Sequence, residues 1–167
     1  MTTSIEETWA ALADLADPEI PVISLRDLGI LRDVRTGADG LEVVITPTYS
    51  GCPAMSQIED DIRSTLKNKG ISARVVTQLA PAWTTDWMTE SGKEKLRAYG
   101  IAPPHQTPAA HNVVRFISRP AKAEAVPCPH CGSSNTVVSS QFGSTACKAL
   151  YKCQDCQEPF DYFKCLK

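Results

Sequence analysis

The sequence lacks a long apolar run, and it has no excess of charge of one sign. No stretch approaches the roughly 18 apolar residues that cross a membrane, and the formal net charge is −2 over 167 residues. The first residues are acidic and lead directly into a helical pattern, without the basic start and apolar centre of a secretory signal. We therefore expect a soluble protein that stays in the cytoplasm and does not bind membranes.

Two sequence patterns of redox enzymes are also missing. The chain has no paired Glu-x-x-His sequences, which supply the ligands of di-iron carboxylate sites, and no glycine-rich dinucleotide fingerprint. These absences exclude a di-iron oxygenase and a nucleotide-dependent reductase.

Charge and proline content divide the chain into three parts. Residues 1–101 carry 10 Lys and Arg against 15 Asp and Glu, whereas residues 102–167 carry 7 against 4. Prolines and alanines are concentrated in residues 102–126, which we interpret as a linker between a domain at 1–101 and a module at 127–167. Four thiolates on a divalent metal would reduce the C-terminal charge of +3 to about +1, which argues against nucleic acid as a partner.

The first domain has a helix, two strands, a helix and a third strand. Ser4 and Glu7 have the spacing of a capping box, and apolar residues then recur at helical spacing until Asp17-Pro18. Strands are expected from residue 30 to about Arg35, at 41–46 and at 71–79, with a helix from the Cys52 turn to Gly70 and another at 89–99. The order predicts an α+β fold, in which a small mixed three-stranded sheet has helices on one face and is followed by a mostly β zinc-ribbon module.

Seven cysteines are abundant for a chain of this length, and four of them form two pairs. Cys128 and Cys131 make one C-x2-C knuckle, and Cys153 and Cys156 make another. In a reducing compartment such pairs bind metal more often than they form disulfides. Two facing knuckles supply four sulfurs in tetrahedral geometry, so the sequence predicts one structural zinc, on which this small module depends to fold. Short strands are expected at 136–141, 149–152 and 160–163.

Cys147 and Cys165 remain outside these pairs. They are either spare thiols or additional ligands of a second or alternative metal, because thiolates also hold iron–sulfur clusters. The identity of the metal in the module, zinc or an iron–sulfur cluster, is therefore left open at this point.

Cys52 lies in a predicted turn between a strand and a helix. With Gly51 before it and Pro53 after it, Cys52 is expected to be the N-cap of the helix. Backbone N–H groups and the helix dipole would then lower the pKa of the thiol and favour metal binding or nucleophilic attack. The alternative is a small buried apolar residue. A thiol enzyme is the weakest interpretation, because none of the three histidines is near Cys52 in sequence.

Several motifs resemble two known families. The N-terminal part resembles the SufT-like iron–sulfur assembly domains in residues 17–21 (Asp-Pro-Glu-Ile-Pro), 27–30 (Asp-Leu-Gly-Ile), 46–48 (Thr-Pro-Thr) and 52–53 (Cys-Pro). Residues 83–88, 143–153 and 158–161 resemble the D proteins of bacterial phenylacetyl-CoA epoxidase systems in particular. The resemblance covers nearly the whole chain except the linker.

This resemblance implies a non-enzymatic accessory factor that assists maturation of the epoxidase, a multicomponent di-iron oxygenase with a separate iron–sulfur flavin reductase. Cys52 corresponds to the reactive cysteine of the assembly family, so it is expected to carry iron or an iron–sulfur unit transiently. The implied partners are subunits of the epoxidase complex or its reductase, and other iron–sulfur assembly proteins. The alternative is a structural zinc-dependent adaptor without metal-transfer chemistry.

Overall fold

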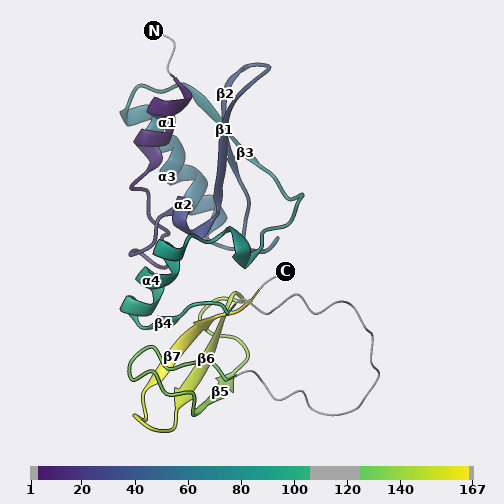
Figure 1. The fold of residues 1–167 in the computed structure, drawn as a ribbon. Helices are drawn as coiled ribbons and strands as arrows, with labels where there is room; N and C mark the ends of the chain where they lie inside the picture. The colour runs from purple at the N-terminus through teal and green to yellow at the C-terminus, as the bar shows by residue number, and fades with distance from the viewer. Residues whose placement is uncertain (1–3, 106–124, 166–167) are drawn as a thin grey trace. The chain divides into compact units, whose positions relative to one another are not determined.

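The computed structural model describes residues 4–105 and 125–165, which divide into two compact units. Unit 1 comprises the described residues up to Tyr99, and unit 2 extends from Gly100 to Cys165. Figure 1 shows both units, each with its own sheet. In the described part of the chain, no helix is long and apolar enough to cross a membrane.

Unit 1 begins with two helices whose N-termini are capped by serine. Helix α1 (Ile5–Leu12) has the predicted capping box, in which Ser4 Oγ accepts from the backbone N–H of Glu7 and the Glu7 carboxylate accepts from the N–H of Ser4. Helix α2 (Leu25–Leu28) is only one turn long and was not predicted. Ser24 caps its start, and Gly29, with φ of 81°, ends it.

The sheet of unit 1 has the strand order β1-β2-β3 within the described residues. Strand β1 (Leu31–Gly37) pairs antiparallel with β2 (Gly40–Ile45), and β2 pairs parallel with β3 (Ala73–Thr77). Helix α3 (Met55–Asn68) makes the crossover between the parallel strands, and α1 and α3 lie on the same side of the sheet (Figure 1). The predicted mixed sheet with helices on one face is confirmed.

The core of unit 1 lies between the helices and the sheet. The apolar stripe of α3 at Ile58, Ile62 and Leu66 is almost completely buried, as are Val43 and Ile45 of the central strand. Spacings of three and four residues place the α3 side chains on one helical face, so their burial fixes how the helix packs. Because the loop with Cys52 connects the end of β2 to the start of α3, this packing also holds both ends of the loop.

After β3 the chain returns to α2 through a short 3-10 helix, η1 (Thr85–Trp87), and helix α4 (Glu90–Tyr99). The Trp83 side chain is buried and its indole N–H donates to the carbonyl of Leu28 at 3.1 Å. The Arg32 guanidinium lies 3.5 Å from the centre of the Trp87 ring. Thus residues 83–87 pack against the segment in which α2 leads into β1.

Unit 2 is built on a sheet with the order β4-β7-β6-β5 in the described residues. Strands β5 (Thr136–Ser140), β6 (Lys148–Cys153) and β7 (Pro159–Phe163) pair antiparallel and agree with the three predicted strands within about one residue. Strand β4 (Ile101–Ala102) pairs parallel with β7 and was not predicted. Of the segment interpreted as a linker, residues 106–124 lie outside the described residues.

Candidate metal centre and Cys52 turn

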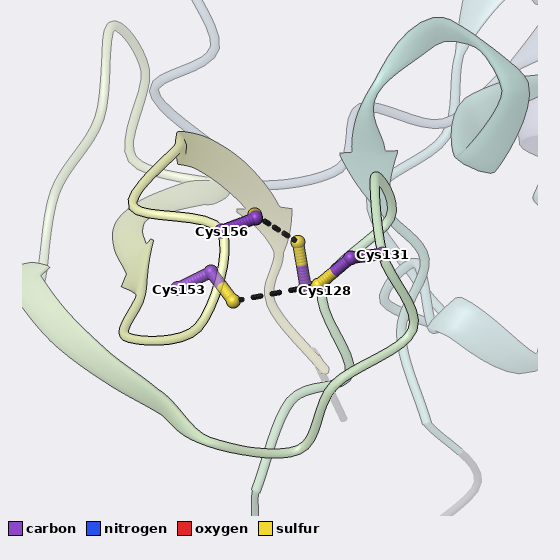
Figure 2. A group of neighbouring side chains, drawn as sticks. All are labelled: Cys128, Cys131, Cys153 and Cys156. Carbon is purple, nitrogen blue, oxygen red and sulfur yellow. Dashed lines mark hydrogen bonds between the residues drawn. The ribbon is translucent and has the colours of Figure 1, made fainter.

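The four cysteines of the two knuckles meet in unit 2. All four sulfurs lie within 4.8 Å of one another. Cys128 Sγ is 3.7 Å from Cys156 Sγ, and Cys131 Sγ is 3.6 Å from Cys153 Sγ (Figure 2). A tetrahedral site with zinc–sulfur bonds of about 2.3 Å has edges of about 3.8 Å between its sulfurs. The donor set therefore fits a single zinc ion.

The two knuckles have the same backbone design. In the first, the N–H of Cys128 donates to the carbonyl of Ser133 at 2.9 Å, and in the second the N–H of Cys153 donates to the carbonyl of Glu158 at 3.0 Å. Gly132 follows the first knuckle with φ of 76°, and Gln157 follows the second with φ of 66°. These left-handed residues reverse the chain after each pair, so both cysteines of a knuckle point toward the same centre.

The four sulfurs lie so close together that a divalent cation would balance the negative charge of their thiolates. Backbone N–H groups of Cys156 and Asp155 lower the pKa of the Cys153 thiol to about 7. The N–H of Glu158 acts in the same direction on Cys156, but desolvation and the three neighbouring sulfurs prevail and raise its pKa to about 12. Four thiolates this close repel one another, and a bound zinc ion would supply the compensating charge.

The spacing also bears on the alternative of an iron–sulfur cluster. In a multi-iron cluster the thiolates are shared among several irons, so their sulfurs lie farther apart than around one ion. The observed separations correspond to one mononuclear ion. A single ion in a compact tetrahedron of sulfurs is typical of structural zinc.

The knuckles are anchored in the small core of unit 2. Cys128 and Cys153 are buried, whereas Cys131 is exposed and Cys156 is half-buried. The aromatic rings of Tyr151 and Phe160 stack at 5.8 Å beside the buried pair. The small core therefore holds one cysteine of each knuckle in place while the second remains nearer to solvent.

Cys147 and Cys165 do not join the four-cysteine group. The Cys147 thiol is buried and lies 3.0 Å from the hydroxyl of Thr145. Cys165 is half-buried, and its thiol donates to the carbonyl of His105 at 3.5 Å. Within the described residues, the only group of three or more close metal-binding side chains is Cys128, Cys131, Cys153 and Cys156.

Cys52 is half-buried in the loop between β2 and α3, but it is not the helix N-cap that the sequence analysis predicted. The N-cap is Ala54, and the first helical hydrogen bond runs from Ile58 N–H to its carbonyl at 2.9 Å. The prediction is wrong because Pro53 belongs to a separate turn, in which the N–H of Met55 donates to the carbonyl of Cys52 at 3.3 Å. Cys52 therefore stands two residues before the cap.

Two consecutive turns hold Cys52. The N–H of Cys52 donates to the carbonyl of Tyr49 at 3.1 Å, and the carbonyl of Cys52 accepts in the turn that leads into α3. Upstream, Thr46 and Thr48 are buried, and the backbone N–H of Thr46 donates to the carbonyl of Ile30 at 2.9 Å. The arrangement places a partly accessible thiol on a tightly turned loop that is anchored on both sides, where it can react with a partner or hold a soft metal.

The structure also contains polar residues around the knuckles that sequence reasoning missed. Asp155 lies inside the second C-x2-C pair and accepts hydrogen bonds from Ser133 and Asn135 beside the first. No sequence signal identifies such a contact, because Ser133 and Asn135 are 22 and 20 residues away from Asp155 in sequence and meet it only in the folded unit.

The chain matches two described families. Residues 115–164 match the PaaD zinc beta ribbon domain, and residues 5–77 match the family of iron–sulfur cluster assembly proteins. The first match contains the four knuckle cysteines, and the second contains Cys52.

Two relatives and one solved structure are similar to the chain. A protein of Escherichia coli (strain K12), named as the D component of a "Putative 1,2-phenylacetyl-CoA epoxidase", is 48% identical over 97% of this chain and 93% of its own length. A protein of Porphyromonas gingivalis (strain ATCC BAA-308 / W83) named "Fe-S protein maturation auxiliary factor" is 35% identical over 54% of this chain and 89% of its own. The crystal structure of a domain of unknown function, DUF59, from Bacillus anthracis has a TM-score of 0.50 at 25% identity, covering 55% of this chain and 90% of that one.

Proposed function

The chain belongs to the family of phenylacetyl-CoA epoxidase D proteins, and on that premise we propose that it is an accessory factor that assists maturation of the epoxidase system. Cys52 carries iron or an iron–sulfur unit transiently and passes it to the oxygenase or the reductase. The zinc ribbon of unit 2 docks on the client protein. The protein performs this role in the cytoplasm, without catalysing the epoxidation itself.

The observation that carries the proposal is the match of residues 5–77 to iron–sulfur cluster assembly proteins, in a chain whose full-length relative is named as an epoxidase component. That match spans the loop with Cys52. A half-buried thiol on an anchored turn supports the proposal chemically, since it is accessible to a partner and is a soft ligand for iron. Other iron–sulfur assembly proteins are the expected source of the metal.

The adaptor alternative rests on the zinc ribbon, which needs no chemistry at Cys52. It differs from the carrier proposal in one testable respect. An adaptor would retain its function when the Cys52 sulfur is removed, provided that both units stay folded.

The test uses cells that lack their own copy of the gene and carry either the wild-type protein or Cys52→Ala. We expect Cys52→Ala to accumulate and keep its zinc, but to support less than about one-tenth of the wild-type epoxidase activity, since a carrier without its ligand cannot deliver metal. Ser50→Ala, an exposed change in the same loop, serves as control and should retain full activity. Full activity with Cys52→Ala would contradict the carrier role and favour the adaptor role.

A further inference from the structure

A carboxylate inside the second knuckle connects it to the segment that follows the first. Asp155 lies between Cys153 and Cys156, and its two oxygens accept from different residues. The hydroxyl of Ser133 donates to Oδ2, and the side-chain amide of Asn135 donates to Oδ1 at 2.8 Å. Both donors lie in the short segment between the first knuckle and β5.

Backbone hydrogen bonds reinforce this connection. The N–H of Asn135 donates to Ser133 Oγ at 3.0 Å, so that the hydroxyl both donates and accepts. The N–H of Gln154, within the second knuckle, donates to the carbonyl of Asn135 at 2.8 Å. The two knuckles are therefore tied together by contacts that do not involve any sulfur.

We propose that Asp155 is a positioning residue for the metal centre, because it holds the two pairs of sulfurs facing each other. Each knuckle is shaped by its own local turn, and the pairing of β5 with β6 and the small core bring the two knuckles close together. Contacts between the knuckles then fix how their sulfurs face each other. These contacts set the geometry in which the four sulfurs meet the metal, and a preformed arrangement also lowers the ordering cost of binding, so they raise metal affinity. This role of Asp155 concerns the zinc ribbon alone and does not depend on the proposed maturation role.

The positioning role of Asp155 does not depend on its charge. Its side chain is exposed, where water and salt screen a single charge. What matters is that both oxygens are used at once, each by a donor from the other knuckle segment. Glu158 offers a matched control, because it carries the same charge two residues after Cys156 and is also exposed.

The experiment measures zinc affinity of the full chain by competition with a chromophoric chelator at pH 7.5, for wild-type protein, Asp155→Ala, Asp155→Asn, Ser133→Ala and Glu158→Ala. Groups that hydrogen-bond to metal ligands typically change metal affinity by about 10- to 100-fold; because Asp155 acts through Ser133 and Asn135, we expect a loss near the lower end of that range, about 10-fold, for Asp155→Ala. Ser133→Ala removes the hydrogen bond to Asp155 and the one from the Asn135 N–H, and should lose about 2- to 10-fold. Asp155→Asn keeps one acceptor oxygen and should fall between wild type and Asp155→Ala, whereas Glu158→Ala should stay within about twofold of wild type.

A second readout separates positioning from a general effect on folding. Cobalt(II) reports the geometry of a tetrahedral sulfur site through its visible absorption bands. In Asp155→Ala saturated with cobalt, we expect bands shifted or broadened relative to wild type and Glu158→Ala. The proposal is overturned if Asp155→Ala binds zinc as tightly as Glu158→Ala, or if its affinity falls while the cobalt bands of the saturated site are unchanged. If Asp155→Ala does not fold, Ser133→Ala and Asp155→Asn decide by the same two criteria.

Discussion

At the scale of the residue, the two knuckles differ in one conformationally important position. Gly132 and Gln157 occupy equivalent places after each cysteine pair and share the left-handed backbone conformation. Glycine adopts positive φ without cost, whereas a residue with a Cβ is strained there by about 1–2 kcal/mol. The second knuckle therefore carries strain that the first avoids.

Replacing Gln157 with glycine should stabilise unit 2. Gln157→Gly relieves the strain but adds chain entropy to the unfolded state and removes the hydrogen bond from the Gln157 side-chain amide to the Gln154 carbonyl, so the expected net gain is about 0.5 kcal/mol. Gly132→Ala should have the opposite effect and cost about 1 kcal/mol. Urea unfolding of the zinc-loaded protein, followed through amide resonances of β5, β6 and β7, measures both. Equal destabilisation by the two substitutions would contradict the claim that Gln157 is strained and Gly132 is not.

The residues also show how far the sequence determines a site. The four metal-binding cysteines could be identified because C-x2-C spacing forces two sulfurs onto one turn. The exact position of Cys52 could not, since Pro53 is compatible both with the first helical position and with a preceding turn, and only the packing of α3 decides where the helix starts. Asp155 could not be recognised because its partners are distant in sequence.

At the scale of the element, periodic segments were predictable and short ones were not. Strand β2 and helix α3 have clear apolar periods and matched expectation. Helix α2 has only four residues, and its signals, Ser24 before it and Gly29 after it, are also common in turns. Strand β4 has two residues and exists only through pairing with β7, which no local pattern encodes.

Helices α2 and α4 are joined by a charged contact that should respond to pH. The Asp27 carboxylate accepts from Lys95 Nζ at 2.7 Å and from the Thr89 hydroxyl at 2.8 Å. Partial burial acts to raise the pKa of Asp27, but these hydrogen bonds outweigh it and hold the pKa below its usual value. A lowered pKa in the folded state means that the contact stabilises the fold above the ordinary carboxyl pKa and is lost as pH falls through the lower, folded value.

We therefore expect Asp27→Asn to reduce the unfolding free energy of unit 1 by about 1 kcal/mol or less at pH 7, because solvent screens this partly exposed pair. The difference from wild type should persist down to about pH 4 and diminish below it. Urea unfolding at several pH values, with the exposed Asp86→Asn as control, measures this. A difference that grows as the pH falls below 4 would have the wrong sign for the proposed contact.

At the scale of the whole molecule, the chain consists of two units that we propose to be thermodynamically separate. Unit 1 has an apolar core under its sheet, whereas unit 2 has a small core beside the four cysteines. The three tryptophans all lie in unit 1, at Trp9, Trp83 and Trp87. Tryptophan fluorescence therefore reports the folding of unit 1 alone.

Removing one zinc ligand should unfold only unit 2. Structural zinc contributes on the order of 10 kcal/mol to the folding of small modules, so unit 2 cannot stay folded without it. We expect Cys131→Ser to abolish zinc binding and the amide resonances of β5 to β7, while the unfolding curve monitored by tryptophan fluorescence stays within about 0.5 kcal/mol of wild type. Ser134→Ala, an exposed change near the first knuckle, is the control. A large shift of the tryptophan curve in Cys131→Ser would contradict the separation of the units.

The central claim is that Cys52 delivers metal to a client protein, and the iron content of the clients tests it most directly. The oxygenase and reductase components are purified anaerobically from cells that produce wild-type protein, Cys52→Ala or Ser50→Ala, and iron is measured per polypeptide. We predict that one of the two components from Cys52→Ala cells contains much less iron than with wild-type protein or Ser50→Ala, although Cys52→Ala itself remains folded with its zinc. Full iron content in both components beside folded, zinc-loaded Cys52→Ala would contradict the carrier role.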